Sequence, residues 1–203
     1  MSKRNVTPDF VLTRAGGIMP NAMAQYVFGW VIALERKFLE AESFQRQRHY
    51  AYTELKYRSF RPLTVSILGL GEIGQGIGRL MKVAGFKVVG FKRHVADGDS
   101  EQFVESADRV SSDLNDVLSV ADFVVNILPS TSATRGLLSL DTLEICREKK
   151  PVFINVGRGD VIKEVDLLGA LDGEEVAEVF VKNLDLQLEN KPMLYPIDWS
   201  NGY

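Results

Sequence analysis

The chain has 203 residues and a formal net charge of −3, and its 45% hydrophobic and 25% charged residues are ordinary for a soluble globular protein. The acidic balance excludes a basic nucleic-acid footprint, and no apolar run approaches the roughly 20 residues of a membrane span. A single cysteine excludes an internal disulfide and a cysteine-based metal site, so we expect a reducing, cytoplasmic setting and no bound metal.

The amino-terminal part predicts an irregular stretch followed by a long helical arm. Residues 1–20 contain Gly16, Gly17 and Pro20 and are expected to be irregular. Asn21 is a plausible N-cap for a helix over 21–52. Its apolar residues recur at spacings of three and four, as on one helical face: Met23, Tyr26, Val27, Trp30, Val31, Leu34 and Phe38. This face either packs in the chain's own core or is covered by a partner subunit, because so long a helix usually reaches beyond its own core.

From residue 61 the pattern changes to alternating strands and helices. Short apolar, β-branched runs predict strands over 63–68, 87–91, 109–110, 122–128 and 152–156. Helices are expected over 73–84, 112–120 with Ser112 as the cap, 140–147 and 164–171. This alternation predicts an α/β fold, a Rossmann-like parallel sheet with helices on both faces. A final helix is expected over 174–190, followed by a docking tail interrupted by two prolines.

The first chemical signal is the spacing Gly69-x-Gly71-x-x-Gly74, directly after a predicted strand and at the start of a predicted helix. Gly69 permits a tight turn, Gly71 lets the backbone approach a pyrophosphate, and Gly74 allows close packing of helix on strand. The helix N-terminus then offers free N–H groups to the phosphates. Two further glycines, Gly76 and Gly78, are interpreted as packing contacts rather than ligands.

The second signal follows the second strand of this motif. A free ribose 2′-hydroxyl is usually bound by an acidic residue about 20 positions after the glycines. Here Lys92 and Arg93 occupy that place, and both cations could pair with a 2′-phosphate. The sequence therefore favours NADP over NAD, although a solvated basic loop would show the same residues.

The third signal is Arg158, which lies between Gly157 and Gly159 after a predicted strand. Ligands in open α/β sheets bind at the carboxyl ends of the strands. The guanidinium group offers a bidentate fork for a carboxylate or a keto acid. A structural or surface arginine is the alternative.

Three stretches in this order resemble the D-isomer-specific 2-hydroxyacid dehydrogenases, in particular the glyoxylate/hydroxypyruvate reductase-like branch. They are TVSILGLGEIGQ over 64–75, NILPST over 126–131 with TRGLL over 134–138, and INVGRG over 154–159. The resemblance implies hydride transfer between NADPH and a 2-keto acid, with Arg158 on the substrate carboxylate and Arg93 on the 2′-phosphate. It also implies cofactor contacts by further residues within these stretches: Glu72, Ile73, Leu128, Pro129, Ser130, Val156 and Gly157.

The same resemblance divides the chain into four parts. Residues 1–20 correspond to a remnant of the substrate lobe, 21–60 to an arm through which two copies dimerise over 21–52, 61–173 to the dinucleotide-binding domain, and 174–203 to a C-terminal helix and tail. Most of the family's N-terminal lobe has no counterpart here. After 171–174 the sequence looks like an internal deletion that removes the family's catalytic Glu and His.

Proton transfer is the open question for function. The chain has two histidines, His49 on the arm and His94 near the expected adenosine end, and neither matches the family's acid/base. We therefore expect a dimeric NADP-binding protein with impaired catalysis. One alternative is an active NADPH-dependent 2-keto-acid reductase with an unrecognised proton donor. The other is a truncated product without function, in which the strand at 152–156 is left as an unpaired edge.

Overall fold

The computed structural model describes residues 16–58, 62–95 and 103–170. The expectations for most of 1–20 and for the helix and tail over 174–203 lie outside these ranges. The chain divides into two compact units. The first holds the residues up to 127 together with 151–156, and the second holds 128–150 together with the residues from 157 onward.

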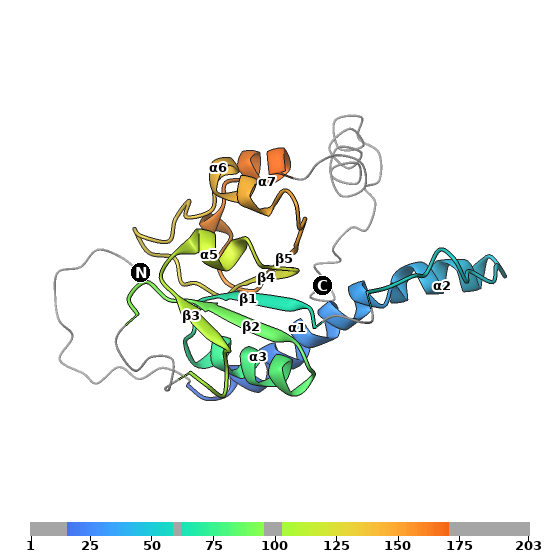
Figure 1. Cartoon of the computed structure of the whole chain (residues 1–203), viewed down its shortest axis with the longest axis horizontal. Coiled ribbons are helices and arrows are strands. Elements are labelled where there is room, and N and C mark those ends of the chain that lie inside the picture. The colour runs from blue at the N-terminus through green and yellow to red at the C-terminus, as the bar shows by residue number, and fades with distance from the viewer. Residues whose placement is uncertain (1–15, 59–61, 96–102, 171–203) are drawn as a thin grey trace, which may run out of the picture. The chain divides into compact units, whose positions relative to one another are not determined.

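The first unit is built on a five-stranded, wholly parallel sheet (Figure 1), so the predicted α/β fold is confirmed. Its strand order is β3-β2-β1-β4-β5. The strands are β1 Thr64–Leu68, β2 Lys87–Phe91, β3 Arg109–Ser111, β4 Phe123–Asn126 and β5 Val152–Asn155. The order reverses between β1 and β4, and ligands of open α/β sheets bind at such a reversal, outside the carboxyl ends of the strands.

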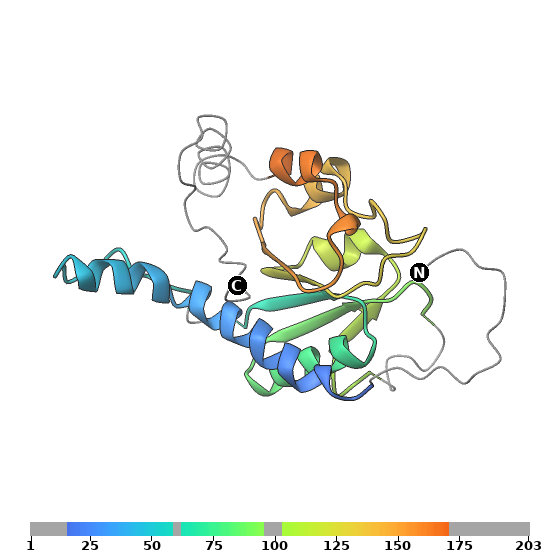
Figure 2. The same cartoon turned by 180° about the vertical axis from the view of Figure 1, so that it is seen from behind.

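Helices cover both faces of this sheet. The long helices α1 (Met19–Glu35) and α3 (Glu72–Val83) lie on one face, and the short helix α5 (Leu114–Leu118) lies on the other, as the two opposite views show (Figures 1 and 2). Since successive strand residues point to opposite faces, Val65 and Ile67 of β1 join the core on the α1/α3 side. Ser66 points the other way and donates a hydrogen bond to the carbonyl of Val117 in α5 (2.7 Å).

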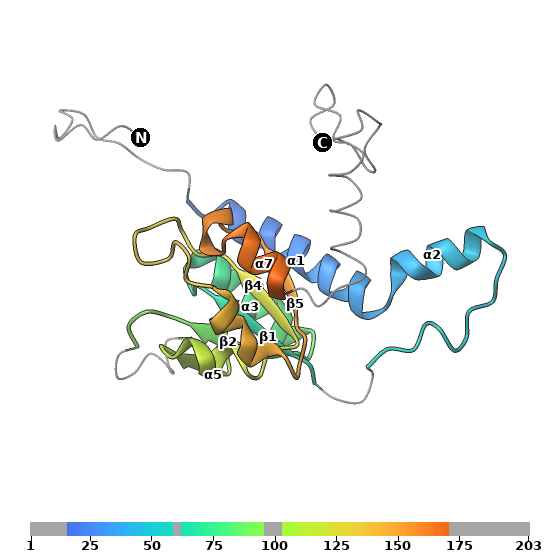
Figure 3. The same cartoon turned by 90° about the horizontal axis from the view of Figure 1, so that it is seen from above.

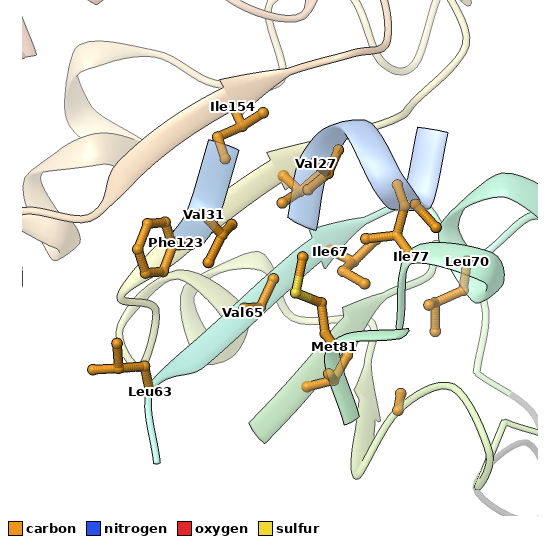
Figure 4. Close-up of a cluster of buried hydrophobic side chains, with 14 of the residues drawn as sticks. Val27, Val31, Leu63, Val65, Ile67, Leu70, Ile77, Met81, Phe123 and Ile154 are labelled. Atoms are coloured by element: carbon orange, nitrogen blue, oxygen red, sulfur yellow. The ribbon is translucent and has the colours of Figure 1, made fainter. Parts of the chain in front are cut away.

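The hydrophobic core of this unit is an interlocked layer between the sheet and the two long helices (Figure 4). Val27 and Val31 of α1 and Ile77 and Met81 of α3 are fully buried there. They pack with Leu63, which precedes β1, and with four sheet residues labelled in Figure 4: Val65, Ile67, Phe123 and Ile154. The central strands β1 and β4 are buried at every position, as expected for a parallel sheet covered on both faces.

The prediction of one helix over 21–52 is wrong, because the arm consists of two shorter helices. The first, α1, ends at Glu35, and the second, α2, spans Phe38–Arg46. Between them Lys37 adopts a left-handed conformation (φ 53°), which ends the hydrogen-bond ladder of α1. Asn21 is not the N-cap, since α1 begins two residues earlier after Ile18. Pro20 fits in the first turn because the N–H that it lacks has no intrahelical partner there.

The apolar face predicted for the arm is only partly used by the first unit. Ala24, Val27 and Val31 are buried against the core. Tyr26 and Trp30 remain 52% and 39% exposed, with their rings in edge-to-face contact. Helix α2 contains no buried residue and continues beyond the sheet (Figure 3). The arm therefore presents apolar surface that the first unit leaves uncovered.

The second unit contains short elements. Helix α6 (Leu140–Leu143) continues as a 3-10 turn (Glu144–Cys146), in place of the single helix expected over 140–147. It begins with a capping box between Ser139 and Thr142. Helix α7 (Glu164–Ala170) packs against α6.

In the first unit the cap of α5 is Asp113, not Ser112, because its carboxylate accepts the N–H of Asn115. In the parts of the chain that the structure describes, no helix is long and apolar enough to cross a bilayer.

Candidate functional site

The glycine-rich turn between β1 and α3 has open space at the position where a bound ligand would approach the protein backbone. Gly69 has a φ of 111°, a conformation that favours glycine. Gly71 forms the N-cap of α3, and a Cβ atom placed on it would meet nothing within 4 Å. The first hydrogen bond of the helix runs from the N–H of Gln75 to the carbonyl of Gly71 (2.9 Å). The preceding N–H groups thus have no intrahelical acceptor, as an anion site at a helix N-terminus requires.

The other glycines of this helix serve packing, as the sequence indicated. A Cβ atom on Gly74 would lie 1.9 Å from the carbonyl oxygen of Gly69, and one on Gly78 would lie 1.9 Å from that of Ser106. At Gly76 the nearest atoms, 3.0 Å away, belong to Pro20 of α1. The close approach of α3 to its neighbours therefore depends on these residues lacking side chains.

The two predicted site residues that follow Gly71, Glu72 and Ile73, differ in solvent exposure. Glu72 is exposed at the first position of α3, and Ile73 is half-buried against the core. The side chain of Gln75 donates to the carbonyl of Leu70 (3.1 Å) and so holds the turn. Backbone N–H groups, rather than these side chains, are the part of the turn suited to bind phosphates.

The two cations after β2 have different surroundings. The ammonium of Lys92 lies 5.0 Å from the centre of the Phe103 ring, in a cation–π contact with a buried side chain. Arg93 is exposed, and no hydrogen bond or ion pair joins it to any described residue. Of the predicted pair, Arg93 is thus the cation available to a phosphate.

At the carboxyl ends of β4 and β5 the first unit carries an amide pair. The side chain of Asn126 donates to the side-chain oxygen of Asn155 (2.9 Å), and the N–H of Val156 donates to the carbonyl of Asn126 (3.0 Å). These bonds fix the strand end from which the predicted residues Val156 and Gly157 follow. The pair was not anticipated from the sequence, although both residues lie in the motifs NILPST and INVGRG.

Arg158 belongs to the second unit and precedes a 3-10 turn (Gly159–Val161). Its side chain is exposed, and its guanidinium donates to the carbonyl of Gly157 (3.2 Å). A Cβ atom on Gly159 would meet nothing within 4 Å. The turn therefore presents an exposed cation flanked by residues without bulk, which suits a carboxylate ligand.

The loop with Leu128, Pro129 and Ser130 is connected to this turn by Ser130 itself and by two side chains that the sequence analysis did not single out, Arg135 and Asp160. The hydroxyl of Ser130 donates to the carboxylate of Asp160 (2.5 Å), and Arg135 donates to the same hydroxyl (3.1 Å). The buried hydroxyl of Thr134 donates to the carbonyl of Pro129 (2.5 Å). The short spacing of Thr131 and Thr134 was the available sequence signal, because such hydroxyls commonly close local turns.

The histidines are not placed as a catalytic pair. His49 follows α2, and its ring contacts the carboxylate of Glu54 at 3.0 Å. That hydrogen bond is the main cause that lowers the pKa of Glu54 to about 2. His94 is exposed just beyond Arg93. Among the described residues, no group of three or more metal-binding side chains could hold a metal ion.

Comparisons with known proteins agree with this geometry. Residues 28–187 match the family model described as D-isomer specific 2-hydroxyacid dehydrogenase, NAD binding domain. The match continues past residue 173, into the segment for which the sequence suggested a separate C-terminal helix. The chain is 33% identical over 168 residues to a D-lactate dehydrogenase of Treponema pallidum. This match covers 82% of the present chain but only 48% of that relative, so the chain spans about half of its length.

Two solved structures show the same fold at moderate identity. A D-isomer specific 2-hydroxyacid dehydrogenase family protein from Aeromonas salmonicida has a TM-score of 0.70 at 27% identity, over 97% of this chain and 74% of that one. An NADPH-dependent glyoxylate/hydroxypyruvate reductase from Sinorhizobium meliloti has a TM-score of 0.62 at 28% identity, over 76% of each chain. The glycine-rich turn, the parallel sheet and the family match together show that this chain belongs to the D-isomer specific 2-hydroxyacid dehydrogenases through their NAD(P)-binding domain.

Proposed function

We propose that the chain binds NADP(H) in preference to NAD(H) and is related in function to the glyoxylate/hydroxypyruvate reductases. The observation that carries the preference is Arg93, an exposed guanidinium after β2 with no partner among the described residues. No carboxylate directly follows β2 to accept hydrogen bonds from a ribose 2′-hydroxyl. A 2′-phosphate would instead gain a charge-assisted, bidentate contact.

The other residues of the proposed site are of chemical types that suit a dinucleotide and a keto acid. The space over Gly71 and the N-terminus of α3, which no side chain caps, would accept a pyrophosphate through backbone N–H groups. Arg158 would pair with the carboxylate of a 2-keto acid and orient it. The bound nicotinamide would supply the hydride, while this chain's own residues bind and orient the reactants.

Catalysis by this chain alone is proposed to be impaired. General acid–base catalysis contributes about 10²–10⁴-fold to such reactions. Of the two histidines, His49 is engaged with Glu54, and His94 lies beside the residue proposed for the 2′-phosphate. Reduction of hydroxypyruvate above background, abolished by Arg158→Ala but not by the exposed control Arg147→Ala, would instead support the alternative of an active reductase.

The cofactor proposal is tested by fluorescence titration with NADPH and NADH. Arg93→Ala should weaken NADPH binding by about tenfold, the scale of one lost charge-assisted contact, and leave NADH affinity unchanged. Arg79→Ala, an exposed arginine of α3, is the matched control and should change neither. Equal losses for both nucleotides would remove the 2′-phosphate assignment. Absence of saturable NADPH binding to the wild type would favour the reading of a product without function.

We also propose that the arm mediates homodimerisation. The support is the uncovered apolar surface on α1 and α2, where Tyr26, Trp30, Phe38 and Leu39 are 39–55% exposed. Exposed large apolar side chains on both helices, one of which (α2) buries no residue, are typical of a subunit interface.

A further inference from the structure

The turn that carries Arg158 is attached to the preceding loop of the second unit at three points. The N–H of Gly136 donates to the backbone carbonyl of Asp160 (2.8 Å), and the N–H of Leu138 donates to that of Val161 (2.9 Å). The third attachment uses side chains, since Ser130 and Arg135 both converge on the carboxylate of Asp160. Asp160 thus takes part in two of the three attachments, once through its backbone and once through its side chain.

The side-chain attachment is a closed triangle of polar groups. Ser130 donates its hydroxyl proton to Oδ2 of Asp160 at 2.5 Å, Arg135 donates through Nε to the Ser130 oxygen at 3.1 Å, and Nε lies 3.3 Å from the same Oδ2. The single hydroxyl proton of Ser130 is therefore committed to Asp160. Ser130 can still accept a hydrogen bond, but it can donate one to a ligand only by leaving the carboxylate.

The exposure of this triangle argues for a role in geometry rather than in stability. The side chains of Arg135 and Asp160 are 64% and 43% exposed. Ion pairs so open to solvent contribute little to the free energy of unfolding. A charge-assisted hydrogen bond is nevertheless directional and restrains the groups that it joins. Here the restrained group is the turn that begins one residue after Arg158.

We propose that Asp160 is a positioning residue for Arg158. Its carboxylate connects the turn at Gly159–Val161 to the loop at 129–136. This connection restrains the backbone next to Arg158 and thereby the position of its exposed guanidinium. This inference rests on the proposed role of Arg158 in binding a keto-acid carboxylate. In this arrangement Ser130 contributes by supporting the turn instead of donating to a ligand.

Two measurements on the purified full chain test this role, in Asp160→Ala, Asp160→Asn and the control Asp141→Ala. Asp141 is an exposed carboxylate of α6 in the same unit, with no ion pair to a described residue. Hydrogen exchange should become several-fold faster in peptides covering 157–162 of Asp160→Ala and stay unchanged in those covering α3. The Kd of oxamate, a keto-acid analogue, for the NADPH-saturated chain should rise about tenfold. Asp160→Asn keeps one acceptor and should fall between the wild type and Asp160→Ala.

The NADPH affinity separates positioning from general damage. The contacts proposed for the phosphates of NADPH, at Gly71, Arg93 and the N-terminus of α3, involve no residue of this cluster, and Ser130 is assigned here to the turn rather than to the cofactor. The Kd of NADPH should therefore change less than about twofold in Asp160→Ala. Unchanged exchange over 157–162, or equal losses of NADPH and oxamate affinity, would overturn the inference. If the wild type binds NADPH but no oxamate, the proposed role of Arg158 fails, and the exchange rates alone then decide whether Asp160 holds the turn.

Discussion

At the residue scale, the glycines of the β1–α3 turn perform two separable tasks. Gly71 faces open space, whereas the position of a Cβ atom on Gly74 is occupied by the backbone carbonyl of Gly69. A backbone atom cannot move aside as a flexible side chain can. One glycine thus serves ligand access, and the other serves the contact between helix and turn.

Paired substitutions distinguish these tasks. Gly74→Ala should lower the free energy of unfolding by about 1–3 kcal/mol, since overpacking against backbone forces a shift of α3. Gly71 itself has a φ of −70°, which any residue can adopt, and there is space for a methyl group. The free energy of unfolding of Gly71→Ala should therefore stay within about 0.5 kcal/mol of the wild type. Urea unfolding gives the stabilities, and NADPH titration should show weaker binding in Gly71→Ala. Equal stability of the two variants would contradict the packing role of Gly74.

At the element scale, Arg58 ties the segment after α2 to two elements of the first unit. Its guanidinium donates to both carboxylate oxygens of Glu35 at the end of α1, with a shortest distance of 2.6 Å, and to Asp122 just before β4 (3.0 Å). These hydrogen bonds, above all that with Glu35, raise the pKa of Arg58. Asp122 is buried and also accepts the N–H of Thr64 at the start of β1 (2.8 Å). One side chain thereby fixes where the arm returns to the sheet.

Removing this connection should cost measurable stability. Arg58→Ala removes the hydrogen bonds from the guanidinium to Glu35 and to the buried Asp122 carboxylate. It should lower the free energy of unfolding by about 1–2 kcal/mol, a value reduced for the partial exposure of the arginine. Arg46→Ala is the control, because its ion pair with Glu42 lies on an exposed helix face and contributes no more than about 0.5 kcal/mol. Urea unfolding of both variants compares the two costs. If Arg58→Ala and Arg46→Ala lower the free energy of unfolding by similarly small amounts, Arg58 acts as an ordinary surface arginine.

At the scale of the whole molecule, the uncovered arm leads to a prediction about assembly. Phe38→Glu should shift the chain toward monomer in sedimentation velocity experiments, because a charge at an apolar interface is costly to bury. Val165→Glu changes an equally apolar residue, 71% exposed on α7, and should leave the oligomeric state unchanged. A wild-type chain that is monomeric at tens of micromolar would contradict the dimer proposal.

The acid stability of the molecule should depend on Asp108. Burial by itself raises the pKa of this carboxyl, but hydrogen bonds from Lys82 (2.8 Å) and from the N–H of Val88 (2.7 Å) outweigh it and leave the pKa below its usual value. A depressed folded-state pKa stabilises the fold above the unfolded pKa of about 3.9, and this contribution disappears as the pH falls through the folded-state value. Asp108→Asn should therefore be less stable than the wild type at pH 7, and the difference should shrink below about pH 4. Urea unfolding at both pH values tests this, and a difference that does not change with pH would contradict it.

The sequence by itself determined the features that depend on local pattern. Apolar periodicity predicted the five strands and most helices close to their observed bounds, and the glycine spacing predicted both the turn and the packing role of Gly74. The motifs at 64–75, 126–138 and 154–159 also indicated the family. These properties are encoded in neighbouring residues, through backbone freedom and the period at which side chains reach one face.

Only the tertiary structure decided which side chains meet across the chain. The left-handed Lys37 divides the expected helix, Lys92 makes a cation–π contact with Phe103, and Asp160 accepts a hydrogen bond from the hydroxyl of Ser130. Helical periodicity continues through 35–38 whether or not the backbone breaks there, so sequence reasoning had no signal for the break. Contacts between residues far apart in the sequence depend on how the helices and strands pack. The spacing of residues along the sequence does not determine that packing.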